Sequence, residues 1–165
     1  MNLSFTTATP ADASVLAALH TAIAEDLTRR HGHGHWSFKT TERGILYSLR
    51  NAYVMVARNS SGIVGTLQLQ IKKPWAIDVS YFTAVKKALY LTGMAVALAN
   101  QKKGIGRLLL DEAIKQARAW PADAIRLDAC DHAAGAGDFY AKCGFREVGR
   151  VTYRQSPLIY FEMVL

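Results

Sequence analysis

Cysteine is scarce in this sequence of 165 residues, and its two cysteines, Cys130 and Cys143, both lie in the C-terminal third. They form no Cys-x-x-Cys pair and no regular ladder with histidine, which argues against a disulfide scaffold and against a zinc finger. Unpaired thiols of this kind are typical of a reducing compartment. Long apolar runs are also missing, since no stretch approaches the roughly 20 residues of a membrane-spanning helix.

The N-terminal segment MNLSFTTATPADAS lacks the basic stretch and the apolar run of a secretory signal peptide. Together with the missing apolar spans, this segment leads us to expect a cytoplasmic protein with no membrane partner. Half of the residues are hydrophobic, so the chain can bury a sizeable core, and its length suits one domain over residues 1–165.

Acidic residues are outnumbered, because Lys and Arg total 20 and Asp and Glu total 13, which gives a net charge of +7. This balance favours an anionic partner such as a phosphorylated small molecule, a nucleic acid or an acidic surface. The lysine pairs are dispersed over residues 72–73, 86–87 and 102–103, and no nucleic-acid-binding motif is present. Nucleic acid is therefore the disfavoured partner.

Apolar periodicity predicts helices and strands that mix without strict alternation, which indicates an α+β domain with a mixed sheet. Helices are expected at residues 10–30, 40–51, 105–120 and 133–144, and strands at 3–9, 52–59, 63–73, 88–98, 124–130, 146–154 and 157–165. The strand at 88–98 is too apolar for a half-exposed position and belongs near the centre of the sheet. Residues 74–87 are compatible with a strand or with an ordered loop.

One segment, LANQKKGIGRLLL at residues 98–110, joins an apolar strand to an amphipathic helix through two lysines and two glycines. The first N–H groups of a helix have no partner inside it, and an anion placed there gains hydrogen bonds and a favourable field. Gly104 and Gly106 let a bulky phosphate approach the backbone, while Lys102 and Lys103 add positive charge. The pattern suits a diphosphate, but a tight turn without a ligand explains it equally well.

Two motifs together resemble the GNAT superfamily of N-acetyltransferases. QKKGIG at residues 101–106 matches the family's Q/R-x-x-G-x-G/A signature, and FYAKCGF at residues 139–145 is similar to its later FY-x-x-x-GF element. The resemblance covers residues 88–165 well and residues 1–73 more loosely. It implies a GNAT-like fold, in which helices flank a central, mixed, mostly antiparallel sheet that is splayed between its fourth and fifth strands.

The resemblance also implies acetyl-CoA as co-substrate and no metal. In the family, the glycine loop holds the pyrophosphate through backbone N–H groups, and the preceding strand pairs with the pantetheine arm. Carried over by position, the implied cofactor-binding residues are Met94, Ala95, Val96, Gln101, Lys102, Lys103, Gly104, Ile105, Gly106 and Arg107.

The implied reaction is direct attack of an amine on the thioester, with Tyr140 matching the family tyrosine that protonates the leaving thiolate. The acceptor would be a primary amine of a small molecule or a peptide, and the resemblance also allows a homodimer. Two departures favour a second hypothesis, a non-catalytic acyl-CoA-binding sensor. The strand YLTGMAV carries no carboxylate, and Ala133 stands where the family often has asparagine. Asp131 and His132 are close enough in sequence to replace that asparagine.

The general base is not defined by any motif. Asp78 and Asp128 are candidates by position alone, and we expect each of them to lie on the solvated surface. A water chain could also take the proton from the amine.

The segment HGHGHW places His31, His33 and His35 at alternate positions, which resembles metal-ligand spacing. Its glycines make it flexible and no companion cysteine or carboxylate stands nearby, so we expect no metal there. In the GNAT fold, the region between the first two helices lines the acceptor pocket, although a solvated glycine-rich loop fits this sequence equally well. The expected acceptor-binding residues are His35, Trp36, Trp75 and Tyr81.

Overall fold

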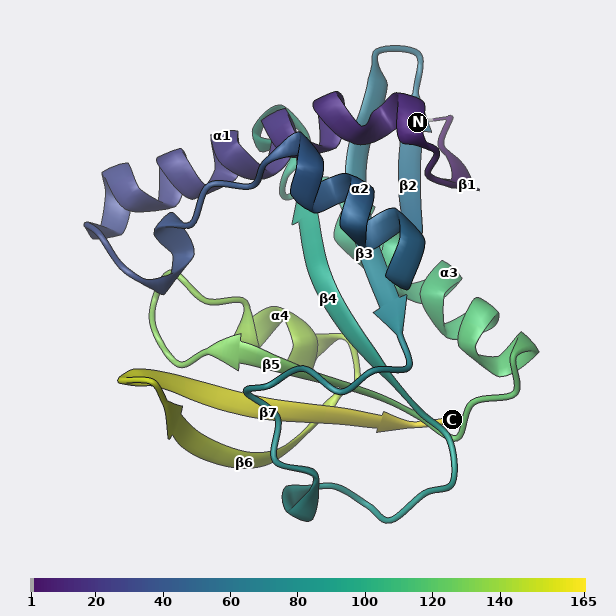
Figure 1. Ribbon diagram of the computed structural model, residues 1–165, viewed down its shortest axis with the longest axis vertical. Coiled ribbons are helices and arrows are strands. Elements are labelled where there is room, and N and C mark those ends of the chain that lie inside the picture. The colour runs from purple at the N-terminus through teal and green to yellow at the C-terminus, as the bar shows by residue number, and fades with distance from the viewer. Residues whose placement is uncertain (1) are drawn as a thin grey trace.

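The computed structural model describes residues 2–165, which contain one seven-stranded sheet with the strand order β1-β2-β3-β4-β5-β7-β6 (Figure 1). The strands are β1 (Ser4–Thr7), β2 (Tyr53–Asn59), β3 (Gly62–Gln70), β4 (Ala88–Val96), β5 (Ala124–Cys130), β6 (Arg146–Tyr153) and β7 (Ser156–Val164). The α-helices are α1 (Ala13–His31), α2 (Glu42–Asn51), α3 (Ile105–Ala119) and α4 (Gly137–Lys142). Short 3-10 helices are η1 (Pro10–Asp12), η2 (His35–Ser37), η3 (Val79–Tyr81) and η4 (Leu98–Asn100).

The sheet splays at its centre, between β4 and β5. These strands are the one parallel pair among the strand pairs described, and they pair only over Ala88–Tyr90 with Ala124–Arg126. Beyond that point β4 diverges from β5, as Figure 1 shows, so the second half of β4 has an edge without a strand partner. The expected mixed, mostly antiparallel sheet, splayed between the fourth and fifth strands and flanked by helices, is confirmed.

Helices cover both faces of the N-terminal half of the sheet, and the alternation of side chains along β2 explains how. Val54 and Val56 point to the face covered by α1 and α2, where they join a buried cluster. Met55 and Ala57 point to the opposite face and pack in the cluster that holds Leu109 of α3. Because β2 is buried on both faces, its sequence reads as a nearly continuous apolar run.

Residues 71–87, between β3 and β4, form an ordered loop with η3, which settles the alternative left open by the sequence. A buried ion pair holds this loop to the sheet: Arg126 Nε lies 3.1 Å from Glu162 Oε2. The Arg126 guanidinium also donates to the carbonyl of Thr83, and the Thr83 N–H donates to Glu162 Oε1 at 3.2 Å. This network therefore fixes the loop against β5 and β7.

Every expected helix and strand is present, with shifts at their ends. The strand expected at residues 63–73 ends at Gln70, the helix expected at 40–51 starts at Glu42, and the helix expected at 133–144 spans only Gly137–Lys142. The first helix opens with the 3-10 turn η1 before α1 begins at Ala13. The helix expected at residues 133–144 starts later, because the Ala134 N–H donates to His132 Nδ1 at 3.0 Å and the Gly135 N–H to the His132 carbonyl at 2.8 Å. None of the helices within residues 2–165 has the length and apolarity needed to cross a membrane.

Candidate active site

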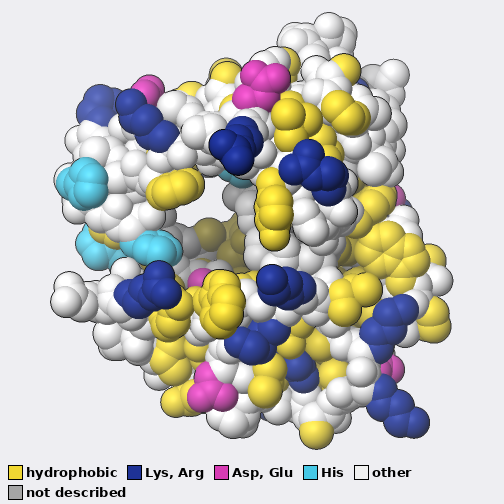
Figure 2. Space-filling model, in the orientation of Figure 1, with side chains coloured by type: hydrophobic (Ala, Val, Ile, Leu, Met, Phe, Trp, Pro, Cys, Tyr) yellow, Lys and Arg dark blue, Asp and Glu magenta, His cyan; other side chains and the backbone are white. Residues whose placement is uncertain are grey.

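A cavity of about 630 Å³ lies where β4 and β5 diverge. Figure 2 shows the hollow that opens there between α1 and the half of the sheet that carries β5, β7 and β6. The residues expected to bind the cofactor that do line it are Met94, Ala95, Val96, Gln101, Lys102, Gly104, Ile105, Gly106 and Arg107, and Tyr140 lines it too. The end of β4, the loop before α3 and the buried Tyr140 therefore line the same cavity.

The loop before α3 presents a row of backbone amides to this cavity. Among the described residues, none accepts a hydrogen bond from the N–H groups of residues 102–107, and the helical ladder starts with Leu108 N–H to the Gly104 carbonyl at 3.1 Å. Lys102 and Gly104 adopt positive φ angles of 60° and 80°. This left-handed turn, which glycine adopts without strain, leaves the amides outside any regular ladder. Free amides at the positive end of a helix form an anion site.

The polar side chains of this loop do not all face the cavity. Gln101 Nε2 donates to the Val96 carbonyl at 3.1 Å, so it ties the loop to β4 rather than turning toward the anion site. Lys103 Nζ donates to the Ala99 carbonyl at 2.8 Å, and Lys103 is absent from the described lining of the cavity. Of the two lysines in this loop, Lys102 is therefore the one that lines the cavity.

Helices α3 and α4 approach closely beside the cavity. An added Cβ at Gly106 would lie 3.1 Å from Cζ of Phe139 and 3.4 Å from Cε of Met94. Arg107 Nη1 donates to the Lys142 carbonyl at 3.2 Å and links the two helices directly. The second glycine of the motif is therefore needed for packing as well as for access to the backbone.

Tyr140, on α4, is buried at 7% exposure, and its hydroxyl donates to Sδ of Met94 at 3.6 Å. Its ring packs edge-on against Phe139 and Phe145. Burial, with a contribution from the negative charge of Asp128, raises the pKa of Tyr140 far above its ordinary value. The phenol therefore stays protonated at physiological pH and can donate a hydrogen bond.

Asp128 is placed differently from the solvated position expected for it. It lies on β5 beyond the last residue paired with β4, and its side chain is half-buried. Burial raises the pKa of this carboxyl, and the nearby His35 opposes the shift only in part. The charge of Asp128 also acts on Tyr140, so the phenol and this carboxyl share one electrostatic environment. Sequence reasoning missed its position, which only the splay of the sheet creates.

Asp78, the other candidate base, is engaged elsewhere. Its carboxylate caps η3 by accepting hydrogen bonds from the N–H of Ser80 at 3.0 Å and from the Ser80 hydroxyl at 2.7 Å. These bonds lower the pKa of Asp78, and its side chain is exposed. Asp78 therefore has a local structural role in the loop between β3 and β4.

The aromatic residues expected in the acceptor pocket fall into two groups. Trp36 stacks on His132 with ring centroids 4.5 Å apart, and His31 packs edge-on against both, so this cluster joins the end of α1 to the loop after β5. Trp75 is 82% exposed, and Tyr81 packs against Tyr160 at 5.5 Å.

The described lining of the 630 Å³ cavity includes none of the four residues expected to bind the acceptor, and that assignment stays a prediction. His35 is nonetheless close enough to influence the pKa of Asp128. Within residues 2–165, His31, His33 and His35 join no group of three side chains able to hold a metal ion.

Helix α1 supplies a part of the wall that sequence reasoning did not assign. Ile23, Leu27 and Arg30 line the cavity from the side opposite to α4. Ile23 and Leu27 are four residues apart, so they share one face of the helix, and both are only half-buried. An apolar face that continues past the packed core toward a helix end was the signal available in the sequence.

A sheet that splays beside a helix start with free amides defines the fold of the GNAT acetyltransferases, and solved structures show the same fold. A ribosomal-protein-alanine N-acetyltransferase from Brucella melitensis matches with a TM-score of 0.75 at 21% identity, over 98% of this chain and 99% of that one. Arabidopsis thaliana NAA60, in complex with a bisubstrate analogue, matches with a TM-score of 0.74 at 15% identity, over 99% and 98%. The structure of yncA from Salmonella typhimurium, with its cofactor acetyl-CoA, matches with a TM-score of 0.73 at 17% identity, over 100% and 95%.

Family membership follows from the sequence profile of the acetyltransferase (GNAT) domain, which matches residues 50–147. This range runs from the end of α2 to the start of β6 and contains the glycine loop and Tyr140. The chain belongs to the GNAT acetyltransferase family. A comparison with curated protein sequences gives no match.

Proposed function

We propose that this protein transfers the acetyl group of acetyl-CoA to a primary amine of a small molecule or a peptide. The observation that carries the proposal is the set of free N–H groups at residues 102–107, which open onto the same cavity as Tyr140. A diphosphate bound at one end of the cavity would place the thioester arm along β4, toward the tyrosine.

The residues present fit acetyl-CoA as the acetyl donor. The free amides of the loop and the charge of Lys102 suit a pyrophosphate, which is a compact dianion. Beyond Tyr90, β4 has no strand partner on its β5 side, so Met94–Val96 offer backbone donors and acceptors to an extended chain. The pantetheine arm is such a chain, and it carries amide groups able to pair with a strand edge.

In the proposed reaction the amine attacks the thioester directly, and side chains of this protein accept and donate the protons. The nitrogen of a neutral amine forms a bond to the thioester carbon while the carbon–sulfur bond breaks. Asp128 is not part of the described lining of the cavity, so it accepts the proton lost by the amine through water, and the Tyr140 hydroxyl donates a proton to the leaving sulfur. Tyr140 then regains a proton from Asp128 through solvent, which restores both groups. Holding both substrates in one cavity supplies much of the rate enhancement.

The acceptor is proposed as a class rather than a compound. The Brucella melitensis structure is named for acetylation of a ribosomal-protein alanine, which supports a peptide amine as one option. The apolar Ile23 and Leu27 beside the charged Arg30 form the wall that such an acceptor would meet. A homodimer and a cytoplasmic location stay predictions.

The proposal is tested by following CoA release from acetyl-CoA against a panel of amines, polyamines and peptides. Tyr140→Phe is expected to lower kcat by about 10²-fold or more, since general acid catalysis typically contributes 10²–10⁴-fold, while the Kd for acetyl-CoA stays the same. Tyr47→Phe, at an exposed position on α2, is the matched control and is expected to leave both values unchanged.

Two results would separate the remaining possibilities. Protection of the protein by CoA against thermal unfolding without any turnover would favour the non-catalytic sensor, which the absence of a polar side chain at Ala133 in the cavity lining also suits. Failure of CoA to bind at all, or an unchanged kcat in Tyr140→Phe, would contradict the proposed catalytic role.

A further inference from the structure

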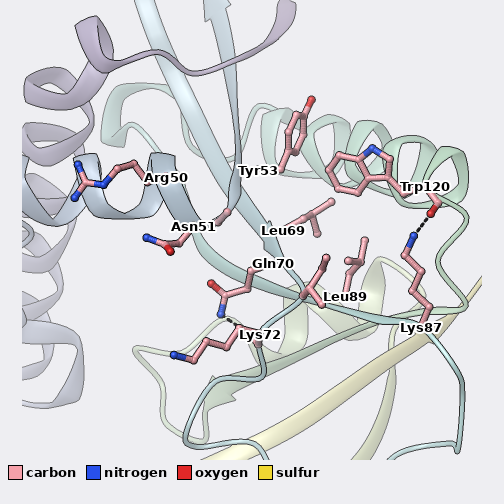
Figure 3. A pocket seen from close by; sticks show the side chains of 11 residues that line it. Arg50, Asn51, Tyr53, Leu69, Gln70, Lys72, Lys87, Leu89 and Trp120 are labelled. Carbon is pink, nitrogen blue, oxygen red and sulfur yellow. Dashed lines mark hydrogen bonds between the residues drawn. The ribbon is translucent and has the colours of Figure 1, made fainter.

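A second cavity, of about 730 Å³, lies at the opposite end of β4 from the candidate active site (Figure 3). It is formed by the end of α2, the start of β2, the end of β3, the start of β4 and Trp120 after α3. Leu89 lines this cavity and Met94 lines the other, so about five residues of strand, or roughly 17 Å, separate the two sites. No role in acetyl transfer accounts for it.

The floor and one wall of this cavity are apolar. Leu69 and Leu89 are almost fully buried and form the floor. Tyr53 and Trp120 meet edge to face, with ring centroids 4.9 Å apart and planes at 88°, and they form the wall shown in Figure 3. Flat aliphatic and aromatic surfaces of this kind suit an aromatic ring.

The rim is cationic on both sides. Arg50 and Lys72 are exposed at the ends of α2 and β3, and neither forms an ion pair with another described residue. Across the cavity, Lys87 Nζ donates to the Trp120 carbonyl, which holds its charge at the rim (Figure 3).

No carboxylate stands among the described residues that line this cavity. The Asp123 carboxylate nearby accepts the backbone N–H of Lys87 at 2.7 Å and is not part of the lining. The rim therefore presents positive charge that no acidic side chain of the lining neutralises.

We propose that this cavity binds a small aromatic anion, an aryl ring that carries a phosphate or a carboxylate. The ring would lie on Leu69 and Leu89 against Trp120. Figure 3 shows Arg50 and Lys72 extended away from this floor, so their exposed side chains would turn toward the anionic group when it binds. The cavity volume falls within the usual range for small-molecule sites, about 300–1,000 Å³. An apolar floor with cationic side chains at its rim provides affinity through the ring and selects for an anion through the rim.

The test uses the intrinsic fluorescence of Trp120 in a Trp36→Phe/Trp75→Phe background, which leaves it as the single tryptophan. The probes are phenyl phosphate and 3-phenylpropionate, and the comparison compounds are benzyl alcohol and inorganic phosphate. Saturation of the Trp120 signal by at least one aryl anion is expected, at concentrations where neither comparison compound acts. Tighter binding of phenyl phosphate would indicate a phosphate ligand, and tighter binding of 3-phenylpropionate would indicate a carboxylate ligand. Calorimetry on the unaltered chain, with and without CoA, shows whether the same Kd holds when the first cavity is occupied.

Charge variants locate the bound anion. Arg50→Gln/Lys72→Gln is expected to weaken aryl-anion binding by about tenfold or more, since two cations contact the anionic group. Arg43→Gln/Lys86→Gln removes the same charge from exposed positions outside the cavity lining and is expected to leave the Kd unchanged. Equal binding of benzyl alcohol or of inorganic phosphate, an equal effect of both double variants, or no binding of either probe would overturn the proposal. Because acetyl-CoA binding and turnover are measured separately, failure here leaves the proposed acetyl transfer untouched.

Discussion

Two ionisable side chains at the splay, Tyr140 and Asp128, respond to burial in the same direction with opposite chemical results. Burial raises the pKa of Tyr140, which keeps the phenol protonated and able to donate. Burial also raises the pKa of Asp128, which makes its carboxylate a stronger base than a solvated aspartate. The same desolvation therefore suits one residue to the proposed role of acid and the other to the proposed role of base.

Replacing Asp128 with asparagine tests the base. We expect kcat/KM to fall by about 10²-fold or more. We also expect the unaltered enzyme to lose activity on acidification as Asp128 is protonated, and this loss to be absent from the pH profile of the variant. Glu25→Gln, at an exposed position on α1, is the control and is expected to keep both the rate and the profile. An unchanged kcat/KM would assign the proton transfer to water alone.

The same substitution has a predictable effect on stability. Because the pKa of Asp128 is raised in the folded state, its contribution favours folding at acidic pH and is lost as pH rises through that folded-state pKa. Asp128→Asn should therefore raise Tm at pH 8, and the gain should shrink toward pH 4. Thermal unfolding followed by circular dichroism at both pH values measures the difference. A lower Tm at pH 8 would show that the carboxylate makes a stabilising contact in the folded state.

At the scale of the element, the start of α3 provides the backbone N–H groups of the proposed anion site. The left-handed turn at Lys102 and Gly104 leaves the amides of residues 102–107 unpaired, and an added Cβ at Gly104 would meet no atom within 4 Å. Gly104 is therefore required for its φ of 80° and not for space. The adjacent Gly106 is required for space, since Phe139 lies against it.

Gly104→Ala is expected to weaken CoA binding by about tenfold, because a left-handed non-glycine residue costs roughly 1–2 kcal/mol and the loop can relieve that strain by moving its amides. Gly62→Ala is the matched control. Gly62 has φ 111° in the β2–β3 turn and open space at its Cβ, so its substitution should reduce stability without changing the Kd for CoA. Calorimetric titration of both variants with CoA gives the comparison, and equal affinities would contradict the role of the turn.

At the scale of the whole molecule, two halves of the sheet meet through three residue pairs between β4 and β5. This short connection opens the cavity, so other contacts must hold the C-terminal half together. The buried pair of Arg126 and Glu162 fixes the loop of residues 71–87 over β5 and β7, and the stack of Trp36 on His132 joins the far side. The cavity between β4 and β5 thus stays open, while contacts away from it hold the two halves of the molecule together.

Breaking the buried pair should destabilise the fold strongly. Glu162→Gln leaves the Arg126 guanidinium buried without its counter-charge, and we expect a loss of about 3–5 kcal/mol in the free energy of unfolding. Glu112→Gln breaks the exposed pair with Lys115 on α3 and should cost less than about 1 kcal/mol. Urea unfolding of the two variants measures both values. Similar losses in the two variants would show that the buried pair is not what fixes the loop.

Local pattern was enough to predict most of the fold. Apolar periodicity identified the helices and strands because each element buries one face or both. The buried residues therefore recur in the sequence about every 3.6 residues in a helix and every 2 residues in a strand. The two motifs at residues 101–106 and 139–145 indicated the family, since glycines beside free amides leave a sequence pattern. Residues 74–87 could not be classified, because this loop is held by Arg126 and Glu162, which are distant in sequence.

The sequence by itself determined the order of the elements, the glycine-rich turn before α3 and the identity of the buried tyrosine. Only the tertiary structure decided the surroundings of Asp128, the contribution of α1 to the cavity wall, and the exclusion of Lys103 and Trp75 from it. The physical reason is that desolvation and cavity shape depend on which surfaces a splayed sheet leaves uncovered. Those surfaces depend on contacts between residues far apart in the chain, and such contacts leave no periodic pattern in the local sequence.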